Sequence, residues 1–110
     1  MSGYSSAFDL GREVALEGIP DPGLNGTIDL GGKSGGTLAL KSTSSTTACT
    51  LPNAPRGTVL FLSNDTGSTC TVSDQSNTVV AVTTKNAAIF VCVTEGSSYI
   101  WKGTLISTHT

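Results

Sequence analysis

The chain has 110 residues, a formal net charge of −2 and few charged side chains (13%). A domain of this size without an excess of Lys and Arg lacks the basic surface of a nucleic-acid-binding protein. Ser and Thr make up 31 of the residues, a composition that favours strands and turns, so we expect an all-β protein.

Residues 1–36 differ from the remainder of the chain, because they hold nine of the 13 glycines and more acidic than basic residues. The segment is too apolar for a solvated tether. One or two helical turns fit between Gly11 and Gly18, and Ile19–Gly23 (IPDPG) predicts a turn. We expect an extended docking arm that binds its own body, a neighbouring copy or another protein through Tyr4, Phe8, Leu10, Val14, Leu16, Ile19 and Leu24.

The arm ends in the stretch GTIDLGGKSGG, residues 26–36, which contains the Gly-Lys-Ser of a phosphate-binding P-loop. The P-loop pattern requires Gly at position 27, where this chain has Thr. The residues that follow have strand character, whereas a P-loop leads into a helix. The sequence therefore indicates a glycine-rich hinge and no nucleotide site.

Residues 37–110 form the expected β body, in which short apolar stretches alternate with polar turns. The turn NDTG at 64–67 predicts a hairpin between its flanking strands. The pattern is typical of a small antiparallel β-sandwich or jelly-roll-like barrel, with strands at 37–41, 46–51, 57–63, 68–73, 78–82, 87–93 and 99–103.

Two of these strands, 57–63 and 87–93, are apolar on both faces, as expected for strands that are covered on both sides. A body of this size buries only about 60% of its unfolded surface. We therefore expect further burial through a homo-oligomer or a partner. The longest apolar run, Ala87–Val93, is too short to span a membrane, and the N-terminus lacks the pattern of a signal peptide.

Side chains that could carry out catalysis are scattered along the chain. The one histidine, His109, is next to the last residue, and Asp65 and Asp74 fall in predicted turns. Calcium binding through Asn64, Asp65, Asp74 and Asn77 is conceivable, but no loop pattern supports it. Three widely spaced cysteines, Cys49, Cys70 and Cys92, are interpreted as small core residues. We expect no enzyme and no catalytic, cofactor or metal site.

Two aromatic residues near the end, Tyr99 and Trp101, lie two apart and so share one face of a strand. They could form a platform for a sugar or a partner. The alternative, which we favour, is that the large aromatic ring anchors the core.

Residues 49–103 resemble the body of head decoration (cement) proteins of tailed bacteriophages. The resemblance rests on Leu51–Pro52 ahead of GTVLFLSN, on TCTV, on AIFVCV and on the closing YIWKG, and covers about half of the chain. Residues 1–36 match no motif of that family.

The resemblance implies a small jelly-roll-like β domain, commonly trimeric, that is made in the bacterial host cytoplasm and bound to the exterior of the virion capsid. The implied partner is the major capsid protein, whose subunits it would bridge against DNA pressure. Many copies of a weak site would act together through avidity. The alternative is a receptor- or glycan-binding module of a head fibre or tail appendage, with Tyr99 and Trp101 in contact with the ligand.

Overall fold

The computed structural model describes residues 18–94, 96 and 98–106. This part of the chain is all β, as expected, and contains no helix. Its strands are β1 (Gly26–Thr27), β2 (Gly35–Leu40), β3 (Ala48–Thr50), β4 (Val59–Asn64), β5 (Cys70–Ser73), β6 (Thr78–Val82), β7 (Asn86–Cys92) and β8 (Trp101–Ile106).

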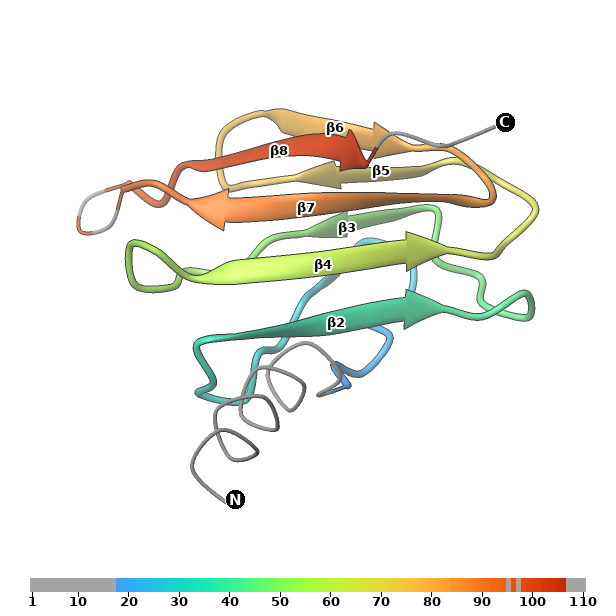
Figure 1. The fold of residues 1–110 in the computed structure, drawn as a ribbon, viewed down its shortest axis with the longest axis horizontal. Coiled ribbons are helices and arrows are strands. Elements are labelled where there is room, and N and C mark those ends of the chain that lie inside the picture. Colours follow the sequence, from blue (N-terminus) through green and yellow to red (C-terminus); the bar gives the residue numbers. More distant parts are fainter. Residues whose placement is uncertain (1–17, 95, 97, 107–110) are drawn as a thin grey trace, which may run out of the picture.

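The strands form two four-stranded sheets in two layers (Figure 1). The sheet nearer the viewer has the order β2-β4-β7-β8 and is called the front sheet; the back sheet has the order β1-β3-β5-β6. Apolar side chains from both sheets fill the space between the layers, as the alternating burial of β4 and β7 requires.

From β1 to β5 the chain alternates between the sheets, and each strand runs parallel to the strand two before it. Paired residues are 23 or 24 positions apart, as in Gly26 with Cys49 and Gly35 with Val59. The chain thus coils through both sheets once every 23 or 24 residues. The antiparallel strands β6, β7 and β8 then complete the two layers.

Both sheets are therefore mixed, and the expectation of a wholly antiparallel body was wrong. The expected hairpin through 64–67 was also wrong, because β4 lies in the front sheet and β5 in the back sheet. The buried Asn64 side chain explains the change of sheet: its amide N–H₂ donates to the carbonyls of Ser68 and Val82, each at 2.8 Å. These bonds direct the chain away from β4 instead of back along it.

All seven strands expected in the body are present, with ends shifted by up to three residues. The faces are also as expected, since Leu38 and Leu40 are both buried, as are Cys70 and Val72. The core contains Trp101 and Phe90 as its largest fully buried side chains. Trp101 also donates its indole N–H to the carbonyl of Pro52 at 3.0 Å.

The boundary between arm and body differs from the expected one at residue 36. Ile19, Ile28 and Leu30 belong to the same buried core as the body, and β1 is a strand of the back sheet. Residue 18 already forms a parallel bridge with Thr37 of β2. Residues 18–36 are thus part of the folded body.

Candidate docking surface

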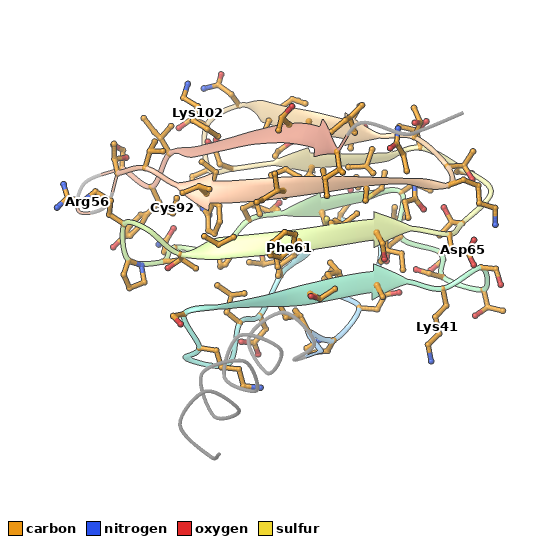
Figure 2. The ribbon with its side chains drawn as sticks, viewed as in Figure 1. Lys41, Arg56, Phe61, Asp65, Cys92 and Lys102 are labelled. Carbon is orange, nitrogen blue, oxygen red and sulfur yellow. The ribbon has the colours of Figure 1, made fainter. Side chains whose placement is uncertain are left out.

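The outward face of the front sheet is unusually apolar at its centre. Along β4 and β7, alternate side chains enter the core, and the others point outward and are half-buried. The outward set on these two strands includes Val59, Phe61, Ile89 and Val91, which we call the outer patch. Figure 2 labels Phe61 midway along β4. The two strands that the sequence analysis expected to be covered on both sides, 57–63 and 87–93, therefore lie side by side, and their outward side chains form one surface.

Strand register brings the outer patch together from segments distant in sequence. Phe61 pairs with Ile89 of β7 and with Thr37 of β2. Val59 pairs with Val91, which pairs in turn with Lys102 of β8. Directly opposed side chains on one face lie about 5 Å apart, so the four apolar groups make one continuous surface.

In the part of the chain that the structure describes, no third layer of secondary structure lies over this face. In residues 18–94, 96 and 98–106 the regular elements are the strands of the two sheets, and the back sheet packs on the opposite side. Contiguous apolar surfaces of this kind mark interaction sites. The outer patch is therefore the best candidate for a docking surface.

A shallow hollow of about 420 Å³ extends the patch toward the carboxyl end of β4. Ser63, Ala87 and Ile106 line it on the sheet. The Lys85 ammonium and the Asp65 carboxylate form an ion pair at its rim. A partner side chain of modest size would fit there between an apolar floor and a charged edge. Ile106 is 44% exposed and lies beyond the strand end expected at 103, so the sequence interpretation missed it. The apolar pair Leu105–Ile106 was the available signal.

The residues expected to bind a partner are divided by the structure. Tyr4, Phe8, Leu10, Val14 and Leu16 lie outside the described residues. Ile19 is a core residue, 7% exposed, and so is not available to a partner. Leu24 is 57% exposed and remains available.

The two aromatic candidates differ in exposure. Trp101 is 2% exposed, and its indole N–H is bonded within the core, so its ring face is not presented to solvent. Tyr99 is half-buried and precedes β8. The structure thus places Trp101 as the core anchor that the sequence analysis favoured.

The Gly-Lys-Ser stretch lies in a turn between β1 and β2. Gly31 and Gly32 have φ of 62° and 78°, values that favour glycine, and β2 follows where a P-loop would have a helix. With the loop 52–58, this turn lines a groove of about 510 Å³ that includes Lys33 and Arg56. Figure 2 shows Arg56 at the same end of the molecule as Cys92.

Two carboxylates outside the hollow, those of Asp74 and Asp21, have structural partners. Asp74 accepts the backbone N–H groups of Ser76, Asn77 and Trp101. Asp21 accepts hydrogen bonds from the hydroxyls of Ser44 and Thr46. Within the described part of the chain, no group of three or more His, Cys, Asp and Glu side chains is placed to hold a metal ion.

Three free cysteines are buried in the body. The sulfur atoms of Cys49 and Cys70 lie 3.9 Å apart, and Cys92 lies 3.4 Å from the carbonyl oxygen of Ala54. The contact with the Cys70 thiol and burial together raise the pKa of the Cys49 thiol. Cys49 is thus held as the protonated thiol, which is a poor nucleophile and a poor metal ligand.

Comparison of the chain with protein-family models, with curated proteins and with solved structures found no match. The part of the chain that the structure describes also holds no helix long and apolar enough to cross a membrane. The outer patch is therefore the feature of the molecule from which we infer a function.

Proposed function

We propose that this chain is a capsid decoration protein of a tailed bacteriophage. In this proposal it binds the outer surface of the capsid and stabilises contacts between major capsid subunits. The observation that carries the proposal is the outer patch, an apolar surface on a small body that the body itself does not cover. Such a surface suits a protein that works by binding to others.

The patch fits a bridging role because it lies on the flat face of a sheet. Its side chains come from two central strands that are fixed by six paired positions, residues 59–64 with residues 86–91 in antiparallel register. A rigid surface loses little conformational entropy on binding. Repeated many times on a shell, a modest contact of this kind is sufficient through avidity.

A homotrimer with a jelly-roll-like body is the finer form of the proposal, and it rests on the family resemblance. The observed connectivity differs from that of a jelly roll: β1 to β5 pair in parallel, whereas the strands of a jelly roll are antiparallel. The proposed role depends on the outer patch and not on that connectivity.

The proposal is tested by capsid binding of full-length variants. Phe61→Thr and Ile89→Thr remove apolar area from the outer patch while keeping residues that suit strands. We expect capsid binding to fall at least tenfold, which corresponds to about 1.4 kcal/mol. The control is Ala81→Thr on β6 of the back sheet, which is exposed and should bind like the parent chain. Undiminished binding by the patch variants would refute the proposed docking surface.

The structure also sets where a deletion of the N-terminal arm must stop. Removing residues 2–30 would delete β1 and the core side chains Ile19 and Ile28, so loss of binding would report unfolding. A deletion that stops at residue 17 leaves the described core intact.

A further inference from the structure

Two of the three buried cysteines lie beside each other in the back sheet. Cys49 is in β3 and Cys70 is in β5, and these strands pair in parallel (Figure 1). Their sulfur atoms are 3.9 Å apart, although the two residues are 21 positions apart in sequence. Because β3 and β5 belong to successive turns of the coiled chain, this contact joins one turn to the next.

Strand register explains why the two thiols meet. Cys49 pairs with Val72, and Cys70 comes two positions before Val72, so the three side chains point to the same face of the sheet. That face is the core side, since all three residues are buried. On its other side β5 is held by β6, where Cys70 pairs with Val82. Cys70 is thus fixed by two neighbouring strands, and Cys49 lies diagonally across from it.

Cys92 has different surroundings. It lies in β7 of the front sheet, where its sulfur is 3.4 Å from the carbonyl oxygen of Ala54 and 3.1 Å from that of Thr94. It follows Cys70 by 22 positions, nearly the separation of Cys49 from Cys70. In an unfolded chain the entropy of closing these two loops is therefore nearly equal. Any preference of Cys70 for Cys49 over Cys92 must come from the fold.

Small movements can convert the thiol pair into a disulfide. The sulfur atoms of a disulfide are about 2.0 Å apart, so those of Cys49 and Cys70 must approach each other by about 2 Å. Rotation of the two side chains and a small shift of β3 along β5 close this diagonal gap. The product keeps the pair on the core side of the back sheet and removes two thiol hydrogens.

The reaction needs an oxidant, which a low-molecular-weight disulfide such as oxidised glutathione supplies. The thiolate of one cysteine attacks a glutathione sulfur, forms a mixed disulfide and releases one glutathione thiolate, which takes up a proton. The second cysteine then loses its proton and attacks the sulfur of the first, which releases the second glutathione. Two protein thiols are oxidised, and one glutathione disulfide is reduced to two thiols. Because the native thiols are buried, the exchange occurs while the strands are apart, during folding or local opening.

We propose that Cys49 and Cys70 form a disulfide within one chain when the protein folds in oxidising surroundings, and stay a thiol pair in reducing ones. The bond ties two successive turns of the coil together in the back sheet, away from the outer patch of the front sheet. The inference goes beyond the proposed function, because it concerns the free chain.

Refolding of the reduced full-length chain in a glutathione redox buffer tests the inference, with a parallel sample oxidised in denaturant. Each sample is quenched with acid, alkylated in denaturant and cleaved after Lys and Arg. Each cysteine then lies on a peptide of its own, because cleavage follows Lys41, Arg56, Lys85 and Lys102. Mass spectrometry of the monomeric protein identifies which two peptides are joined.

The quantity measured is the ratio of the Cys49–Cys70 bond to the Cys70–Cys92 bond. In denaturant we expect a ratio within about twofold of one, because the two loops are nearly equal in length. In native buffer we expect a ratio of at least about twenty, because the fold holds only Cys49 next to Cys70.

Two variants provide the controls. Cys92→Ala should leave the yield of the Cys49–Cys70 bond unchanged within about twofold, and in Cys70→Ala the thiols of Cys49 and Cys92 should stay unpaired in native buffer. If a variant fails to fold, the ratio in the parent chain decides alone. Equal ratios in native buffer and in denaturant, a predominant bond to Cys92, or no bond within the native chain would overturn the inference. Since no capsid is present, these outcomes are independent of capsid binding.

Discussion

The Asp74 carboxylate accepts the backbone N–H of Trp101 at 3.1 Å, and so joins residues 27 positions apart in sequence. Its other oxygen accepts the N–H groups of Ser76 and Asn77, each at 2.8 Å. One side chain thereby fixes the turn between β5 and β6 of the back sheet and the start of β8 in the front sheet. This link between the sheets is a polar bond at the edge of an apolar core.

The pH dependence of stability follows from this carboxylate. Burial alone raises the pKa of Asp74, but the hydrogen bonds from Asn77, Ser76 and Trp101 and the charge of Lys102 outweigh burial and lower it. A carboxyl with a lowered folded pKa contributes stability that is present above its unfolded pKa and lost as the pH falls through the folded pKa. We expect the free energy of unfolding to fall as the pH decreases below about 4, and Asp74→Asn to remove part of that decrease.

Urea unfolding between about pH 2 and pH 7 measures this dependence. The control is Asp29→Asn, because Asp29 is exposed and accepts a local N–H, from Gly31 at 2.8 Å. The pKa of Asp21 is lowered too: burial raises it, and hydrogen bonds from Ser44, Thr46 and Gly23 outweigh that effect. In the Asp74→Asn variant, the part of the pH dependence of the unfolding free energy that comes from Asp21 should therefore remain. An acid profile identical to that of the parent chain would contradict the role of Asp74.

A second prediction concerns the buried amide of Asn64. Its oxygen accepts the backbone N–H and the hydroxyl of Thr66, and its N–H₂ donates to two carbonyls. Asn64→Asp keeps nearly the same shape but places a carboxylate against those carbonyls. We expect a loss of at least about 2 kcal/mol in the free energy of unfolding at neutral pH. Asn53→Asp, at an exposed position, should change it by less than about 0.5 kcal/mol. Equal effects of the two substitutions would contradict the explanation for the change of sheet after β4.

A third prediction concerns Gly35, in the stretch that resembled a P-loop. A Cβ atom at this position would lie 2.5 Å from the carbonyl oxygen of Val59, a backbone atom of the neighbouring strand. We expect Gly35→Ala to lower the free energy of unfolding by about 1–3 kcal/mol, because β2 and β4 must move apart. At Gly67 an added Cβ meets nothing within 4 Å, so Gly67→Ala serves as the control. Thermal unfolding of the two variants compares them directly, and similar melting temperatures would refute the close approach.

The sequence predicted the strands well because each one is short and alternates. Leu38 with Leu40 and Cys70 with Val72 show their faces without reference to any other strand. Pairing was predicted poorly, because a turn such as NDTG is typical of a hairpin whether or not its strands share a sheet. The hydrogen bonds that the buried Asn64 amide donates to the carbonyls of Ser68 and Val82 are tertiary contacts, and they reveal that the chain changes sheet there.

The candidate surface was predictable only in part. Strands 57–63 and 87–93 are apolar on both faces, which indicated that their outward faces bind something. The sequence does not show which residues meet on that face, because the strand register decides that Phe61 lies opposite Ile89. The role of Ile19 could not be read from the sequence, because an apolar residue among Gly and Pro fits an arm as well as a core. Its bond to Thr37 of β2 is a tertiary contact with no local signal.

A fourth prediction concerns the thiols of Cys49, Cys70 and Cys92, all of which are buried. A thiol reagent must reach the sulfur and attacks it as the thiolate, and burial keeps all three sulfur atoms from solvent. At Cys49 the contact with the Cys70 thiol, together with burial, also raises the thiol pKa, whereas at Cys70 burial is the protection. In the native protein we expect Ellman's reagent to react at least about a hundredfold more slowly than in denaturant, where all three thiols should react. Rapid reaction of a thiol in the native protein would show that the body opens locally at that strand.

The proposed function is tested most directly by cryo-electron microscopy of virions that carry this chain. We expect density for the two-sheet body on the exterior of the capsid, with Phe61 and Ile89 of the front sheet turned toward the major capsid protein. Density on the tail or on a fibre, or a body bound to the shell by the back sheet, would contradict it.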